Sequence, residues 1–401
     1  MLQGIKQEVA RLWYRANHKR LGRKILSLTL AFGLMGSLAA CQSGDKKEES
    51  SQTSSSGVSV ESQASESSES LASSEKESSS SEKMTQNQYD SPFSGLRLAA
   101  LKGPTSMGLL KFVQETGEKR GVKFSMKTLP EEMAQALLKN EVDIACLPAN
   151  LAAVLYNKSK GGLRALGITN EQVLELVENG ESMLEPKDLK GKTIYTTGQG
   201  ATPQACLEAF LKKLGIDPKT DVKIQYFPEA AEAGKNLLAK EGAVGFLPQP
   251  FATAVQVQSK GLVRVPFSFK DAWEKAFAGK VHIVTGIMVA TADFPVEGDI
   301  LKAWAKQMSQ SFTWTNMHPK EAAEMIEEAG IVKAPIAEQA IPHCDIHWLD
   351  ESASPSLEQR LRSYYEFLQK ENPKLIGGQL PGDDFYSYVN PQSKDDASSA
   401  K

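Results

Sequence analysis

Long apolar runs, histidine and a strong charge of one sign are all scarce in this sequence of 401 residues, which has five histidines and a formal net charge of −3. Its apolar segment at residues 25–40 is shorter than the roughly 20 residues that span a membrane. The small net charge gives no basic surface, so we expect no nucleic-acid partner. We recognise no nucleophile with a paired base, no carboxylate dyad and no cofactor lysine motif. We therefore expect a protein that is not an enzyme and has no cofactor.

The first 40 residues have the charge pattern of an exported protein. Residues 1–24 carry seven Lys or Arg against Glu8 alone, and the apolar segment that follows ends in LAAC at Cys41. This order resembles a bacterial lipoprotein signal peptide at residues 1–40. The resemblance implies that Cys41 becomes the mature N-terminus and carries lipid, with acyl chains such as palmitate, at the extracellular face of the cell membrane. An uncleaved anchor with an incidental cysteine is the alternative.

Residues 41–91 follow as a linker dominated by Ser, Glu, Gln and Lys. Such a segment buries too little apolar surface to offset the entropy of ordering, so we expect it to be disordered. A tether of this kind lets a folded domain stand clear of the membrane and favours a Gram-positive host. The polar tail at residues 391–401 is expected to be disordered too.

Three cysteines remain once Cys41 is lipidated: Cys146, Cys206 and Cys344. An odd number predicts at least one free thiol, and a domain of this size needs no disulfide framework. Cys146 lies in an apolar strand pattern and Cys206 in an apolar helix pattern. Both are therefore predicted to be buried and inert.

From residue 96 onward, short apolar runs alternate with amphipathic helical patterns, which is typical of α/β units. The candidate strands are residues 96–101, 143–147, 192–197, 222–227, 243–247 and 283–290. The candidate helices include residues 106–119, 131–140, 203–214, 230–240 and 300–315.

Four loops lie where a candidate strand ends and a helix begins: KGPTS from Lys102, PAN from Pro148, GQGAT from Gly198 and PQP from Pro248. In open α/β sheets, ligands bind beyond the carboxyl ends of the strands, where helix N-termini carry partial positive charge. Two of the loops lie in each half of the domain. If the halves are separate lobes, all four loops are able to converge on one cleft.

Four segments carry a family resemblance: ALKGPTSMG from Ala100, DIACLPAN from Asp143, GKTIYTTGQGATP from Gly191 and GFLPQPF from Gly245. They are similar to periplasmic-binding-protein-like type II domains of ABC transporters, a group that includes nitrate, sulfonate, taurine and thiamine-precursor binders. The resemblance implies two lobes, each a mainly parallel sheet flanked by helices, joined by a double crossover hinge.

In that fold the first lobe comprises residues 92–185 and 286–390, and the second comprises residues 186–285. The crossovers are expected near residues 178–187 and 282–288. The resemblance also implies a monomer that captures a small molecule between its lobes and delivers it to separate permease and ATPase subunits. The alternatives are an enzyme of the same fold, similar to menaquinone- or thiamine-pathway enzymes, and a ligand-sensing surface lipoprotein.

Seven residues of the four loops are candidate ligand contacts: Lys102, Thr105, Ser106, Asn150, Gln199, Thr202 and Gln249. A loop lysine is often only solvated, and Ser, Thr and Asn are common helix caps. Gln199 and Gln249 are preferred, because glutamine is not a favoured cap and its amide both donates and accepts hydrogen bonds. Lys102 and the helix N-termini favour an anionic ligand.

Two further motifs are discounted. GQGATP from Gly198 lacks the third glycine of a dinucleotide fingerprint, and Pro203 suits the first turn of a helix. HCDIH from His343 contains metal-ligand residue types, but as a strand it places His343, Asp345 and His347 on one face and Cys344 on the other. We expect no metal site and a structural role for this motif, while a metal role of His343 or His347 is left open.

Overall fold

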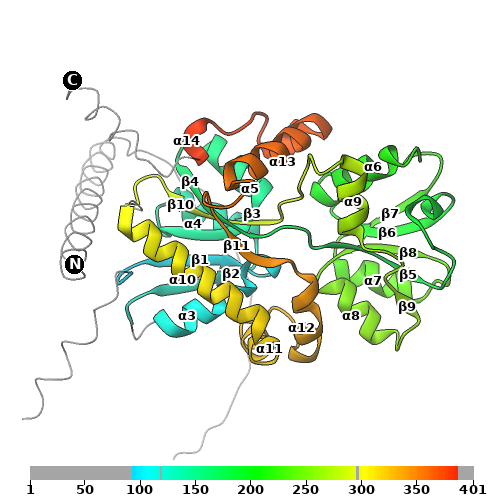
Figure 1. The fold of residues 1–401 in the computed structure, drawn as a ribbon, viewed down its shortest axis with the longest axis horizontal. Coiled ribbons are helices and arrows are strands. Elements are labelled where there is room, and N and C mark those ends of the chain that lie inside the picture. The colour runs from blue at the N-terminus through cyan, green and yellow to red at the C-terminus, as the bar shows by residue number, and fades with distance from the viewer. Residues whose placement is uncertain (1–92, 118–119, 295–297, 387–401) are drawn as a thin grey trace, which may run out of the picture. The chain divides into compact units, whose positions relative to one another are not determined.

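The computed structural model describes residues 93–117, 120–294 and 298–386, whose elements are labelled in Figure 1. The expected signal peptide, the expected lipidation site Cys41, the linker and the tail lie outside the described residues. Among the helices of the described ranges, none is long and apolar enough to cross a membrane.

The strands form two sheets. The first sheet has six strands in the order β11-β4-β10-β3-β1-β2, and the second has five in the order β7-β6-β8-β5-β9. The strands are β1 Arg97–Leu101, β2 Lys123–Lys127, β3 Ile144–Pro148, β4 Leu163–Asn170, β5 Leu174–Asn179, β6 Thr193–Thr197, β7 Lys223–Phe227, β8 Val244–Pro248, β9 Val263–Arg264, β10 Gly286–Thr291 and β11 Ile346–Leu349.

Helices connect most of these strands. They are α2 Pro104–Met107, α3 Leu110–Thr116, α4 Pro130–Leu138, α5 Ala149–Lys158, α6 Thr202–Lys213, α7 Ala230–Leu238, α8 Phe251–Gln258, α9 Phe269–Phe277, α10 Gly298–Met317, α11 Pro319–Glu328, α12 Ala334–Ala340, α13 Leu357–Glu371 and α14 Asp383–Tyr386. Short 3-10 turns, η2 Pro186–Leu189, η3 Ile341–His343 and η4 Pro373–Ile376, complete the order.

The central strands are apolar on both faces because helices cover both faces. In β1, Leu98 and Ala100 join a core that contains side chains of α3, α10, α11 and α12, whereas Ala99 and Leu101 join a second core. In the second sheet, α6 and α9 lie on one face and α7 and α8 on the other (Figure 1). Burial on both faces explains the continuous apolar runs of the sequence.

The predicted α/β fold with two helix-flanked sheets is confirmed, but the sheets are more mixed than the expected mainly parallel ones. The pairs β1–β2, β1–β3, β6–β7 and β6–β8 are parallel, whereas β10 and β5 pair antiparallel with their neighbours. β5 follows β4 of the first sheet, and β10 follows α9, which packs on the second sheet. A strand that does not arrive through a helical crossover in its own sheet is free to pair antiparallel.

The expected first crossover near residues 178–187 is wrong. The chain leaves β4 of the first sheet at Asn170 and enters β5 of the second sheet at Leu174, and it returns between β9 and β10. Because β5 pairs with β8, the boundary at residue 185 assigns this strand to the wrong sheet. We call residues 171–173 the first crossing and residues 282–285 the second crossing.

The expected single helix at residues 106–119 is also wrong within its described part. It divides into α2 and α3 at Gly108, next to Leu109, which makes a 3-10-type bond to the Ser106 carbonyl. A side chain at position 108 would overlap the ring of Phe312 on α10, so the close approach of that helix requires glycine here.

Candidate functional site

In the first sheet, the carboxyl ends of β1, β3 and β4 lie along one margin, perpendicular to the strands, which we call the edge of the sheet. β1 and β3 run parallel, with Ala100 opposite Cys146. Gly286, the first residue of β10, lies opposite both Pro148 at the end of β3 and Asn170 at the end of β4. The loops after β1, β3 and β4 therefore share this edge.

The second sheet repeats the arrangement. β6 and β8 run parallel, with Thr196 opposite Phe246, and β5 begins with Leu174 opposite Pro248 at the end of β8. The loops after β6 and β8 therefore lie at the same edge as the start of β5.

The first crossing joins these two edges. Only three residues separate Asn170 from Leu174, so their Cα atoms are at most about 14 Å apart. Val173 accepts a hydrogen bond from the backbone N–H of Gln249 at 2.7 Å, which ties the crossing to the loop after β8. On the other side, the Thr285 N–H donates to the Asn170 carbonyl at 3.2 Å, and the Ala149 N–H donates to the Thr285 carbonyl at 3.0 Å. Both edges are thus fixed to the two crossings by backbone hydrogen bonds.

Of the candidate contacts in the first loop, only Lys102 is exposed. Thr105 and Ser106 are buried, and their hydroxyls donate to the carbonyls of Leu101 at 3.4 Å and Gly103 at 2.9 Å. Neither caps α2, whose N-cap is Gly103. The two hydroxyls hold the local turn.

The other loops divide in the same way. Asn150 is half-buried in the first turn of α5, and Gln199 is exposed. The hydroxyl of Thr202 is buried near Tyr364 on α13, and it has no hydrogen-bond partner among the described residues. Within the described ranges, the side chains of Lys102, Asn150 and Gln199 also make no protein hydrogen bond and, unlike the Thr202 hydroxyl, are not buried, so they are the candidates most available to a ligand.

Gln249 is the candidate whose surroundings differ most from the reasoning that selected it. It is 1% exposed, and its Oε1 accepts hydrogen bonds from the backbone N–H of Thr253 at 3.2 Å and from the Thr253 hydroxyl at 2.8 Å. The side chain therefore serves the first turn of α8, as a capping residue does. Its role as a ligand contact stays a prediction.

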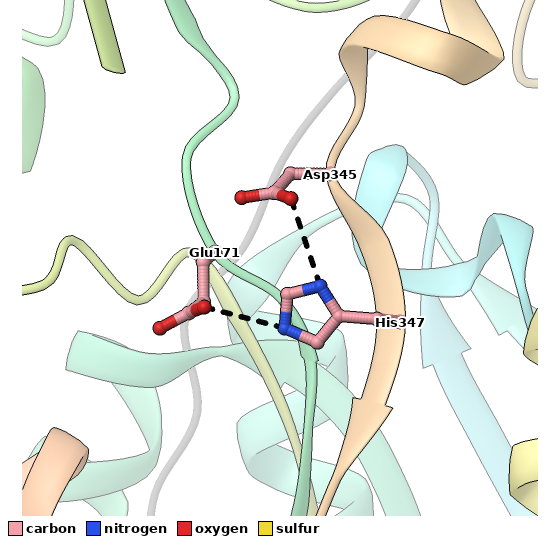
Figure 2. A group of neighbouring side chains, drawn as sticks. All are labelled: Glu171, Asp345 and His347. Carbon is pink, nitrogen blue, oxygen red and sulfur yellow. Dashed lines mark ion pairs between the residues drawn. The ribbon is translucent and has the colours of Figure 1, made fainter. Parts of the chain in front are cut away.

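A charged cluster lies beside the crossings, and of its members only Asp345 and His347 stood out in the sequence, as part of HCDIH. His347 on β11 stands between two carboxylates (Figure 2): its Nε2 is 3.4 Å from Oε2 of Glu171, and its Nδ1 is 3.7 Å from Oδ1 of Asp345. Arg360 on α13 lies 2.6 Å from Glu171, and Lys270 on α9 lies 2.9 Å from Asp345. We call these five residues the crossing cluster.

The local backbone explains why HCDIH does not form the expected continuous strand. His343 ends the 3-10 turn η3 and is exposed, while Asp345 adopts a φ of 47° immediately before β11 begins at Ile346. Aspartate is one of the few residues that tolerate this left-handed conformation. The turn separates His343 from Asp345 and His347, and only the latter two reach Glu171.

The cluster holds His347 in its charged form. Burial lowers the pKa of His347, but the ion pairs with Asp345 and Glu171 outweigh burial and raise that pKa to about 9. For the two carboxyls, burial acts in the opposite direction and raises the pKa. The nearby cations outweigh it, so His347 and Arg360 bring the pKa of Glu171 below its ordinary value, and His347 and Lys270 do the same for Asp345. At neutral pH, an imidazolium therefore lies between two carboxylates.

The same three residues are of metal-ligating types, and ligand atoms of Glu171, Asp345 and His347 lie within 4.8 Å of one another. Each carboxylate, however, already pairs with a cation, and a protonated imidazole has no free lone pair for a metal. The cluster fits a proton better than a metal ion.

A pocket of about 270 Å³ opens next to the cluster. Its lining includes Glu171 and Gln172 of the first crossing, His282 and Ile283 of the second crossing, and Lys270 of α9. None of the seven candidate ligand contacts is among its lining residues. This pocket is therefore separate from the four loops.

The predicted cysteine chemistry agrees with the structure. Cys146, Cys206 and Cys344 are free and buried. Burial raises the pKa of Cys146 and of Cys344 to about 12, so both thiols are protonated and unreactive at neutral pH.

Residues 109–273 match the family model described as "ABC transporter, phosphonate, periplasmic substrate-binding protein". No curated protein matches the chain.

Among solved structures, an ABC transporter protein from Parabacteroides distasonis is similar, with a TM-score of 0.60 and 23% identity over 73% of this chain and 98% of that one. The periplasmic aliphatic sulphonate binding protein of Escherichia coli has a TM-score of 0.55 and 16% identity, over 72% of this chain and 91% of that one. A sulfonate ABC transporter's periplasmic binding protein from Methylobacillus flagellatus has a TM-score of 0.52 and 15% identity, over 75% and 93%. These likenesses show a shared fold, in agreement with the resemblance noted in the sequence.

Proposed function

We propose that this chain is the substrate-binding protein of an ABC importer, because residues 109–273 match a family model of that kind and the fold is shared with such proteins. It captures a small anionic molecule where the edges of its two sheets meet. The observation that carries the proposal is the three-residue first crossing, which brings the loops of both sheets to one place. A ligand bound there touches both lobes.

The chemistry of this place favours an anion. The helices α5, α6 and α8 begin immediately after, or within a few residues of, the ends of β3, β6 and β8 at the two edges. Helix N-termini offer free N–H groups and partial positive charge. The ammonium group of Lys102 adds a full charge at the first edge, and the free amides of Asn150 and Gln199 are able to donate hydrogen bonds. Sulfonates, phosphonates, nitrate and carboxylates all fit this donor set.

Thermal shift of the full chain against those four classes of anion tests the proposal. A ligand at a hundredfold excess over its dissociation constant stabilises the native state by about 2.7 kcal/mol. Lys102→Ala, Asn150→Ala and Gln199→Ala should each weaken binding by about 1–3 kcal/mol without lowering the melting temperature of the free protein.

Lys123→Ala is the matched control for Lys102→Ala. Lys123 is exposed and begins β2, whereas Lys102 follows the end of the neighbouring parallel strand β1, so the two lysines lie at opposite edges of the first sheet. If the control weakens binding as much as Lys102→Ala does, the ligand does not bind at the loop edge. A product formed from a stabilising anion would favour the enzyme alternative instead.

We further propose that the protein is a monomeric lipoprotein, anchored through Cys41 at the extracellular face of the cell membrane and delivering its ligand to a permease. The LAAC sequence that follows a basic and then an apolar segment supports the anchor. Expression with an alkyne analogue of palmitate should label the wild type and leave Cys41→Ser unlabelled and released from the membrane. Equal labelling of both proteins would contradict the anchor.

A further inference from the structure

We propose that the crossing cluster is a positioning device for the ligand site: its charges hold the first crossing in place, and through the crossing they set how the two sheet edges face each other. This inference rests on the proposed ligand site between the edges. The residues concerned are Glu171, Lys270, Asp345, His347 and Arg360.

The cluster joins parts of the chain that belong to different lobes. Glu171 lies in the first crossing, and its carbonyl accepts a hydrogen bond from the hydroxyl of Thr285 in the second crossing. His347 is on β11 at the margin of the first sheet. Lys270 is in the first turn of α9, whose Phe269 packs against Phe246 of the second sheet with ring centroids 5.0 Å apart. The ion pair between Lys270 and Asp345 therefore connects one lobe directly to the other.

Short hydrogen-bonded paths lead from the cluster to the ligand loops. Asp345 accepts a hydrogen bond from the Gln172 N–H at 3.1 Å, and the next residue, Val173, holds the Gln249 N–H. On the other side, Thr285 bonds to Glu171 through its side chain and to the Ala149 N–H through its carbonyl. A shift of Asp345 or Glu171 is thus transmitted to the loop after β8 and to the start of α5.

Packing also joins the lobes, because Trp273 on α9 lies edge-on to Phe367 on α13 with ring centroids 5.5 Å apart. The link between α9 and Asp345, however, is an ion pair. Lys270 is 51% exposed at its side chain and reaches both oxygens of Asp345, at 2.9 and 3.0 Å. An exposed pair of this kind adds at most a small amount to stability. Removing the charge of Lys270 is therefore expected to loosen the lobes relative to each other without unfolding the protein.

Distances between spin labels on the two lobes test the proposal. The labels are placed at Lys139→Cys after α4 and at Lys219→Cys between α6 and β7, both at exposed positions, in the full chain carrying Cys41→Ser. The three cysteines of the described residues are buried and do not compete for label.

Lys270→Gln should broaden the distribution of label distances without added ligand, and Lys270→Arg should restore the wild-type width because it restores the charge. Lys275→Gln is the matched control, since Lys275 is exposed on the same helix and lies outside the cluster. If Lys270→Gln gives the same width as Lys275→Gln, the crossing cluster does not hold the lobes in position.

The width of the distance distribution measured as a function of pH gives a second test. A role of His347 in packing alone would not make this width depend on its protonation. The charged and titratable groups around His347 are Glu171, Asp345, Lys270 and Arg360, with Glu274 and His282 across the adjacent pocket. Raising the pH from about 7 to about 10 removes the proton of His347, so the wild-type distribution should broaden. His347→Gln is neutral throughout and should be broad at both pH values. Equal broadening of both proteins on raising the pH would overturn the assignment to His347.

The two proposals fail separately. If none of the anions raises the melting temperature but Lys270→Gln broadens the label distances, the positioning role of the cluster is retained and the proposed ligand class is refuted. If an anion binds but Lys270→Gln leaves the width of the distance distribution unchanged, the ligand site is retained and the positioning role of the cluster is refuted.

Discussion

Raising the pH from about 6.5 to about 9.5 should destabilise this protein, and His347 should account for a measurable part of the loss. The pKa of His347 is about 9 in the folded protein against 6.5 for a free histidine. A group whose pKa is raised by folding stabilises the native state fully below its unfolded pKa. That stabilisation disappears as the pH rises through the folded pKa.

The size of the effect follows from the shift. A rise from 6.5 to about 9 corresponds to about 3 kcal/mol, at 1.36 kcal/mol per pKa unit. The side chain of His347 is 31% exposed, so solvent screens part of its attraction to the two carboxylates. We therefore expect a loss on the order of 1–2 kcal/mol across this range.

Urea unfolding of the wild type and of His347→Gln at both ends of the pH range measures the effect. Subtracting the two curves removes the contributions of all other titrating groups, because both proteins share them. The difference in unfolding free energy should be largest at the lower pH and should vanish near the upper pH. A difference that does not change with pH would refute the charged state assigned to His347.

Three further predictions concern stability alone. Burial raises the pKa of Glu175 to about 7. The free energy of unfolding of the wild type, measured with urea, should therefore fall as the pH rises from about 4.5 to about 7, and Glu175→Gln should make it less dependent on pH over that range. Arg264→Met removes a partner 2.9 Å from the fully buried carboxylate of Glu178 and should cost about 3 kcal/mol in the same assay, whereas a cost near zero would show that Lys192 compensates. Gly286→Ala adds a side chain that would overlap Asn170, and should cost about 1–3 kcal/mol in thermal melting.

The six candidate strands could be predicted because their signal is local. Residues 143–147, for example, form a short apolar run followed by a loop and a helical pattern, and β3 occupies residues Ile144–Pro148. A strand buried on both faces needs such a run wherever it lies in the chain. The order of these six strands is therefore readable without tertiary contacts, whereas β2, β4, β5, β9 and β11 were not predicted.

Strand β5 was missed for the opposite reason. Its sequence, LELVEN, contains Glu175 and Glu178, which do not suggest a buried strand. In the structure, Glu178 is buried because Arg264 and Lys192, far away in the sequence, supply its countercharges. The position of the first crossing depends on these distant partners, and the family resemblance, applied without them, placed it too late.

The crossing cluster was invisible for a related reason. Its members come from four separate segments, and Arg360 lies 189 residues after Glu171. The HCDIH sequence drew attention to His347, but the local pattern predicted a continuous strand that would have kept His343 beside it. Within HCDIH, Asp345 has a left-handed backbone conformation, which turns the chain and separates His343 from His347.

The seven candidate contacts illustrate what sequence position alone determines at a ligand site. The position at the end of a strand correctly placed the four loops at two sheet edges, since that follows from strand order. It did not distinguish hydroxyls and amides that serve the backbone, as in Ser106 and Gln249, from those left free, as in Asn150 and Gln199. Both groups contain the same residue types, so the difference arises only when the chain closes on itself. Selection of the proposed anionic ligand should therefore depend on the free side chains, while the helix N-termini after these loops supply an attraction that does not distinguish one anion from another.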